Sequence, residues 1–209
     1  ILFSIVIGVP VGIISAVRQD TFADYITRSF AIGALSNPSF WFATMAILIL
    51  SLQFKWIPPL QFVPFFENPG ENLQVMLLPS LILGINMSGA LMRMTRTTLL
   101  EVLRQDYIRT ARSKGLLDRI VLYRHAMKNA FIPIVAILGL EMAHVIGGSV
   151  VLETIFALPG VGKFVFDVIL LRDYPAIQAA NLMLAFFVLG INLVIDIFQA
   201  LLDPRIRYA

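Results

Sequence analysis

An acid and an imidazole stand three residues apart in one of the most apolar stretches of the chain. Glu141 and His144 follow the segment "FIPIVAILGL", and residues three apart lie on one face of a helix. Ionisable groups at membrane depth are candidates for a solute or proton pathway, although the pair could equally serve hydrogen bonds between helices. The pair supplies too few ligands for a metal site. We predict that Glu141 and His144 line a translocation pathway, and the packing alternative stays open.

Other familiar chemistry is missing from the sequence. The chain has no cysteine and two histidines, which excludes disulfides, thiolate chemistry and a histidine-rich metal cluster. The segment "GVGK" at Gly160–Lys163 lacks the first glycine and the Ser or Thr of a phosphate-binding loop. There is no Gly-x-Ser-x-Gly, HExxH or paired-aspartate motif. The sequence therefore predicts no catalytic residue, metal or cofactor, and it disfavours an intramembrane hydrolase.

The most polar segment, "RQDYIRTARSKGLLDRIVLYRHAMKN", runs from Arg104 to Asn129. Apolar side chains recur at helical spacing on both sides of Gly115, and glycine suits the left-handed turn that ends a helix. The pattern predicts two short amphipathic helices that meet at a sharp turn. Such a unit could dock on a protein partner or hold anionic lipid. The aromatic residues and the glycine break favour the protein partner.

The remainder of the chain is typical of a membrane protein. Of 209 residues, 58% are hydrophobic and 14% are charged, against about 25% charged in soluble domains. Stretches of about 20 apolar residues can cross a bilayer as helices. We predict one domain over residues 1–209, an all-α polytopic transmembrane bundle. Its five visible spans are 1–17, 29–54, 73–92, 130–152 and 176–202.

The basic residues orient these spans. If the spans alternate in direction, 13 of the 16 Lys and Arg residues fall on one side of the membrane, which predicts that this side is cytoplasmic. Residues 93–129 then form a cytoplasmic loop, and residues 153–175 form an outer hairpin that turns at Pro159-Gly160. The membrane accounts for the positive charge, so no nucleic-acid partner is expected. A sixth span before residue 1 would place both termini inside, and we expect one.

Polar residues elsewhere in the spans have simpler expected roles. We predict that Asn86, Asn181 and Asn192 form hydrogen bonds between helices. Asp196, near the inner end of the last span, is expected to pair with an arginine at that end. The outer hairpin contains "FVFDVILL", which is too short to span and suits a re-entrant or interfacial segment. Whether the hairpin lies at a pathway mouth or only packs on its own spans remains open.

Two segments resemble a known family. "YIRTARSKGL" followed by "LYRHAMKNAFIPIV" resembles the permease subunits of bacterial ABC importers, specifically the first permease of the dipeptide, oligopeptide and nickel group. Arg109, Thr110 and Ala111 stand at the Glu-Ala-Ala triplet of that family's cytoplasmic loop, and Gly115 stands at its glycine. The acid of the triplet and the Leu-Pro ending are replaced here, as is typical of the peptide branch. "GGSVVLETIFALPGVGKFVFDVILLRDYP" and "LLDPRIRYA" extend the resemblance over nearly the whole chain.

The resemblance implies the type I importer permease fold in a bacterial cell (inner) membrane. It implies a second homologous permease, two cytoplasmic ATPase subunits that hydrolyse ATP, and an external solute-binding protein. The small residues Gly84, Gly89 and Gly139 suit close packing against that second permease. The residues that the resemblance assigns to ATPase coupling are Tyr107, Arg109, Thr110, Ala111, Arg112, Lys114, Gly115, Arg124 and His125.

The alternative function is an ATP-independent channel or secondary transporter. Secondary transporters often contain internal repeats, and the two halves of this sequence show none that is convincing. The solute stays open among dipeptides, longer peptides, nickel chelates and glutathione-like molecules.

Overall fold

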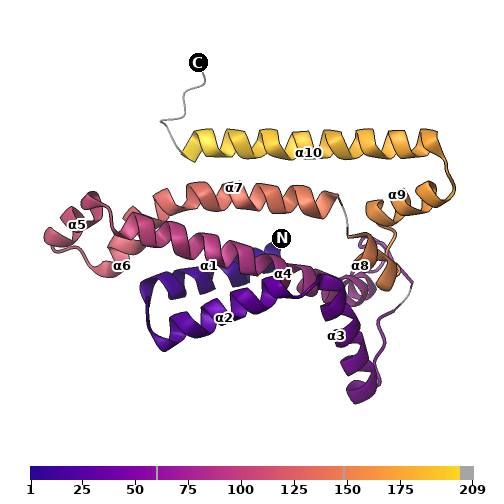
Figure 1. Ribbon diagram of the computed structural model, residues 1–209, viewed down its shortest axis with the longest axis horizontal. Coiled ribbons are helices and arrows are strands. Elements are labelled where there is room, and N and C mark those ends of the chain that lie inside the picture. Colours follow the sequence, from indigo (N-terminus) through magenta and orange to yellow (C-terminus); the bar gives the residue numbers. More distant parts are fainter. Residues whose placement is uncertain (60, 148, 203–209) are drawn as a thin grey trace.

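The computed structural model describes residues 1–59, 61–147 and 149–202. All regular elements in these ranges are helices. The helices α1, α2, α4, α7 and α10 lie roughly along one long axis, whereas α3 points away from it (Figure 1). Helix α4 is central and contacts α1, α2, α3 and α7, while α10 lies on the far side of α7. The helices are α1 (Leu2–Val17), α2 (Phe22–Ser36), α3 (Ser39–Phe54), α4 (Pro69–Leu103), α5 (Asp106–Ser113), α6 (Asp118–Ile120), the π-helical turn η1 (Val121–Ala126), α7 (Met127–Ile146), α8 (Val150–Ile155), α9 (Val161–Leu170) and α10 (Tyr174–Leu202).

The long apolar helices confirm the all-α membrane architecture. Pro69–Leu103, Asp118–Ile146 and Tyr174–Leu201 are each long and apolar enough to cross a membrane. Helix α1 is apolar but shorter than this, with 16 residues. Helices α2 and α3 meet this standard only as a pair.

The structure divides the predicted span over residues 29–54 between two helices. Helices α2 and α3 are separated at Asn37 and Pro38 and bend by 98°. Asn37 is extended, with φ −110° and ψ 135°, as expected for a residue that precedes proline. Proline also lacks the N–H that would continue the helix. The apolar run is therefore two helices with an elbow between them.

Small residues bring helices together within this chain. A Cβ atom on Gly84 would lie 2.5 Å from the Cβ of Phe3, and one on Gly89 would lie 2.9 Å from the carbonyl oxygen of Ala31. A Cβ on Gly139 would collide with the side chain of Ile195. These three glycines were expected to face a second permease. The structure corrects this, because their close contacts are with α1, α2 and α10 of the same chain.

A buried ion pair ties α1, α2 and α4 together. The Asp24 side chain is fully buried. Arg96 Nε donates to its Oδ1 at 2.9 Å, and Arg96 Nη2 donates to its Oδ2 at 2.8 Å. The Ser15 hydroxyl and the Asp20 backbone N–H also donate to this carboxylate. A bidentate, fully hydrogen-bonded pair is the arrangement that offsets the desolvation of buried charge.

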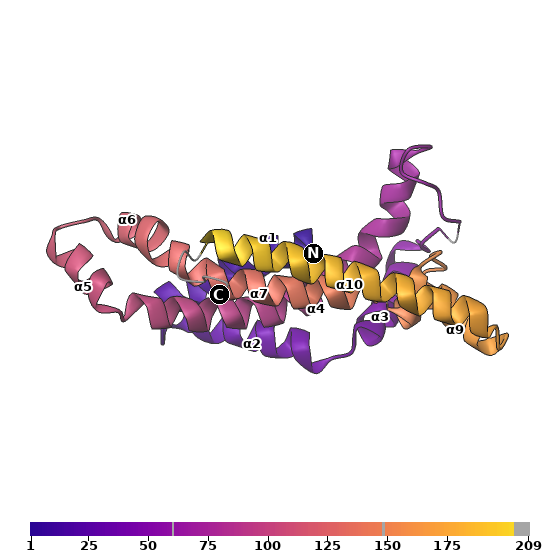
Figure 2. The same cartoon turned by 90° about the horizontal axis from the view of Figure 1, so that it is seen from above.

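The predicted loop over residues 93–129 is largely helical. Helix α4 continues to Leu103, and the second expected amphipathic helix is the start of one long helix over Asp118–Ile146. Only α5 stands apart, at one end of the molecule (Figure 2). We call this the loop end, and the opposite end, with α8 and α9, the hairpin end.

Candidate functional site

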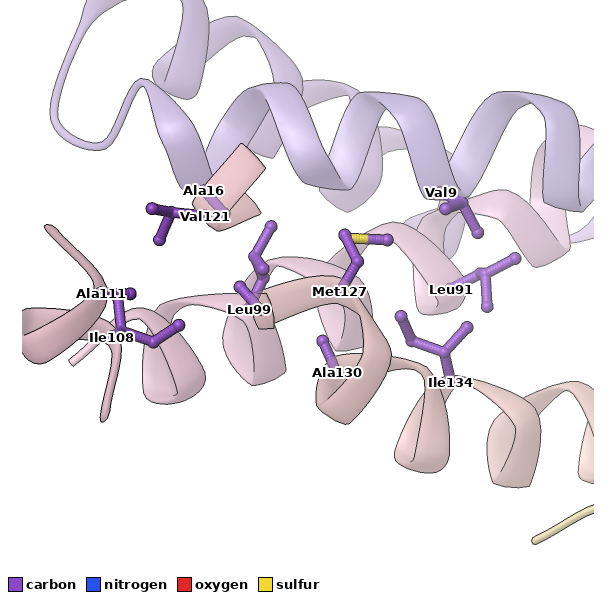
Figure 3. Packing of buried hydrophobic residues seen from close by; sticks show 11 residues of the cluster. Val9, Ala16, Leu91, Leu99, Ile108, Ala111, Val121, Met127, Ala130 and Ile134 are labelled. Atoms are coloured by element: carbon purple, nitrogen blue, oxygen red, sulfur yellow. The ribbon is translucent and has the colours of Figure 1, made fainter. Parts of the chain in front are cut away.

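Helix α5 is fixed to the bundle by its apolar side. Ile108 is fully buried and Ala111 is 8% exposed, in one cluster with Leu99 of α4 and Val121 of η1. Figure 3 shows these side chains together between the helices. The loop end is therefore an extension of the core, and a force on α5 would be passed directly to α4 and α7.

The opposite side of α5 is polar and exposed. Of the residues assigned to coupling, Tyr107, Arg109, Thr110, Arg112 and Lys114 are exposed. The Asn129 side-chain amide donates to the Tyr107 hydroxyl at 2.7 Å, which links α5 to α7. The exposed face therefore presents cations, and the contacts of the opposite, buried face fix the orientation of the helix.

The turn after α5 depends on Gly115. Its φ is +76°, which confirms the sharp glycine turn expected from the sequence. Its N–H donates to the Arg112 carbonyl at 2.9 Å, and Arg112 Nε pairs with Asp118 Oδ1 at 3.2 Å across the turn. A Cβ at Gly115 would meet nothing within 4 Å. The backbone conformation, not space, requires glycine here.

Two of the remaining coupling residues lie in a π-helical turn that the sequence analysis missed. Arg124 and His125 lie in η1, where Arg124 is exposed and His125 is half-buried. Ala111 faces inward and could support a partner contact only by positioning α5. A signal for η1 exists in the burial pattern, because Val121 and Ala126 are both fully buried and stand five residues apart. An α-helix repeats its faces every three or four residues, whereas a π-helix bonds i to i+5.

A second feature is a cavity lined by both polar and apolar residues. It has a volume of about 370 Å³ and lies where the elbow between α2 and α3 meets α4 and α7. Glu141 and His144 both line it, which shows that they share a face of α7. The polar residues in its lining are Ser39, Asn86, Glu141, His144 and Ser149.

Asn86 supports the elbow beside this cavity. Its side-chain amide donates to the carbonyls of Ala34 at 2.9 Å and Asn37 at 3.3 Å. These bonds confirm the predicted interhelical role, and they satisfy carbonyls near the helix break. Asn181 and Asn192 instead lie on the exposed surface of α10. Asp196 is exposed too, and the nearest following arginines lie outside the described residues.

At the hairpin end, a side-chain hydrogen bond fixes α8 to α9. The turn at Pro159-Gly160 separates α8 from α9, and α9 has only 10 residues. Glu153 Oε2 accepts a hydrogen bond from the Lys163 backbone N–H at 2.7 Å, in the first turn of α9. A Cβ on Gly160 would collide with the Glu153 carboxylate. The acid and the glycine together set the angle between α8 and α9.

Comparison with known proteins assigns these apolar helices to a family of membrane proteins. Residues 8–208 match the family described as the binding-protein-dependent transport system inner membrane component. The chain belongs to this family. It is accordingly a multi-pass protein of the bacterial cell (inner) membrane.

Curated members of this family are similar over almost the whole chain. A Brucella abortus protein named as a peptide transport system permease is 42% identical, covering 98% of this chain and 65% of that protein. The dipeptide transport system permease of Alkalihalophilus pseudofirmus is 37% identical, over 99% of this chain and 68% of its own length. The oligopeptide transport system permease of Bacillus subtilis is 40% identical, over 99% and 66%. The chain thus spans about two thirds of the length of the relatives it matches.

Proposed function

We propose that this chain is the transmembrane permease subunit of an ATP-driven importer of peptides or a related small solute. The observation that carries the proposal is α5, which combines an exposed cationic face with an apolar face buried in the core. Membership in the family and the peptide-permease names of the relatives support it.

In this proposal α5 is the coupling helix. Its exposed face docks on one of two cytoplasmic ATPase subunits, which hydrolyse ATP, while this chain hydrolyses nothing. ATP-driven closure of the ATPases displaces α5. Ile108 and Ala111 transmit that displacement to Leu99 and Val121, since all four share one buried cluster. The chain then alternates between two packed arrangements, driven by differential nucleotide affinity.

The solute pathway in this proposal includes the cavity at the elbow. A second homologous permease supplies the facing wall, and an external binding protein delivers the solute. The cavity volume of about 370 Å³ falls within the usual range for small-molecule sites. Glu141 and His144 would contact the solute or the water around it.

The test uses two substitutions at Gly115. Gly115→Val should cost roughly 1–3 kcal/mol, because a β-branched residue is strained at positive φ. Gly115→Asn should cost less, because asparagine tolerates this conformation. Both side chains enter open space, so only the backbone distinguishes them. We expect the valine variant to insert in the membrane but to recover less ATPase in a pull-down, and the asparagine variant to resemble the parent.

The control is Gly33→Val in α2, where the added side chain also meets open space. Equal ATPase recovery and equal transport per ATP for all three variants and the parent would remove the coupling role from α5. Transport that continues after the ATPase is removed would indicate an ATP-independent channel or secondary transporter.

A further inference from the structure

A groove of about 920 Å³ lies at the root of the loop end, between the ends of α1 and α4 and the α6–η1 segment. It is separate from the exposed face of α5 described above, although Arg112 borders both. Its apolar lining is supplied by Ala16, Val17, Leu100, Leu103 and Leu122. The first two of these end the apolar run of α1, so the groove opens where a membrane-embedded helix gives way to polar chain.

The remaining lining of the groove consists of three arginines, one acid, Gln19 and Tyr123. Arg104, Arg112 and Arg119 all line it, and Asp118 is its one acidic residue. Asp118 is paired with Arg112 at 3.2 Å. Within the described part of the chain, neither Arg104 nor Arg119 forms an ion pair. The groove therefore carries two uncompensated guanidinium groups beside an apolar surface.

This combination fits one kind of ligand. Guanidinium groups bind phosphate through paired hydrogen bonds, and an apolar surface at the membrane boundary suits the glycerol and first acyl carbons of a lipid. Basic pockets between transmembrane helices on the cytoplasmic side are suited to anionic headgroups. A free phosphate would leave the apolar residues without a partner.

We propose that this groove binds the headgroup of an anionic phospholipid of the inner leaflet. Arg104 and Arg119 hold the phosphate, and Leu103 and Leu122 contact the start of the acyl chains. A lipid seated there would join the end of α4 to the start of the α6–η1 segment. It would thus restrict the motion of the end of α4 and of the α6–η1 segment, between which α5 lies in the chain. The exposed face of α5 would stay unoccupied.

The experiment measures retained lipid on the full-length protein, purified with the subunits that accompany it. Samples are equilibrated with phosphatidylglycerol or phosphatidylcholine in mixed micelles, and bound lipid is counted by native mass spectrometry. The test variant is Arg104→Gln with Arg119→Gln. The matched control is Arg93→Gln with Lys128→Gln, which removes the same charge from exposed positions outside the groove. Circular dichroism checks that both variants keep the parent's helix content.

We expect the test variant to bind phosphatidylglycerol about thirty-fold more weakly, at about 1 kcal/mol per arginine. The control should stay within about twofold of the parent, and phosphatidylcholine should bind weakly to all three proteins. A variant with lysine at both positions should bind more tightly than the glutamine variant, because it keeps the charge, but less tightly than the parent, because lysine cannot form the paired hydrogen bonds.

Three results would overturn the proposal. An equal loss in the control would show diffuse attraction to the surface rather than a site. Displacement of the lipid by millimolar inorganic phosphate would show a site for free anions. Unchanged lipid binding together with loss of the copurifying ATPase would show that the groove binds protein.

Discussion

Helices α4 and α10 have similarly apolar stretches but opposite surroundings. Their most apolar windows have mean hydropathies of 1.8 and 2.1. Half of the α4 window is buried within the chain, but none of the α10 window is. Helix α4 is surrounded by α1, α2, α3 and α7, whereas α10 packs on α7 and α9.

The difference shows that hydropathy reports insertion in a membrane and says little about what a helix contacts there. Helix α4 buries polar groups such as Ser88, Thr95 and Thr98, whose hydroxyls can bond within the helix. Helix α10 presents large apolar side chains outward, including Phe186 and Leu189. Exposed apolar area of this size needs lipid or another subunit. The core of this chain is thus built around α4, and α10 forms part of its outer surface.

The largest expected contrast between the two regions comes from their aspartates. Asp24→Asn leaves the partly buried Arg96 without its counter-charge, and should cost about 3–5 kcal/mol. Asp196→Asn on α10 removes an exposed carboxylate and should change unfolding by less than about 0.5 kcal/mol. Denaturant titration of both variants in the same detergent measures the difference. Equal losses would mean that α10 is as much a part of the core as α4.

Glycines in the two regions should differ by a smaller amount. A Cβ on Gly12 would lie 2.7 Å from the Cβ of Thr95 and 2.8 Å from the Met92 carbonyl oxygen, whereas one on Gly190 of α10 meets nothing within 4 Å. Gly12→Val should therefore force α1 away from α4 and cost about 1–3 kcal/mol. Gly190→Val should be close to neutral. The same denaturant titration measures the free energy of unfolding of both variants. An unchanged value for Gly12→Val would show that the α1–α4 contact can relax.

The smallest expected effect on folding is in α7, which lies between these regions. Glu141→Gln and His144→Gln change polar groups that line the cavity without removing a core contact. Unfolding should shift by less than about 1 kcal/mol, while solute-stimulated ATP hydrolysis of the assembled complex should change several-fold. If both variants assemble and transport as the parent does, the pair serves packing and the pathway lies elsewhere.

Much of this arrangement could be predicted from local sequence signals. The glycine turn at residue 115, the Pro-Gly turn of the hairpin and the interhelical role of Asn86 each follow from the chemistry of one or two residues. The elbow at Pro38 carried a signal too, but a run without charges outweighed it in the span prediction. Proline should have been weighed more heavily there, because it also restricts the residue before it.

Other features depend on residues that are distant in sequence. Asp24 and Arg96 are 72 positions apart, and nothing local indicates that they pair. For the same reason the sequence could not assign Gly84, Gly89 and Gly139 to contacts within the chain rather than to a partner. Small residues predict a close approach between helices, but they do not identify the approaching helix.

The π-helical turn η1 has a consequence for how this helix can change in length. Its buried residues Val121 and Ala126 are five positions apart, one more than an α-helical face uses. The π-helical turn therefore acts as a one-residue insertion. The helical segments before and after it keep their buried faces on the same side. Removing one residue between them would restore α-helical spacing and leave Ile108 and Ala130 facing the same neighbours. One-residue deletions elsewhere in Asp118–Ile146 would turn every following side chain away from its contacts by about 100°. In this helix, a one-residue deletion leaves the following side chains facing their present neighbours only in the turn that contains Arg124 and His125.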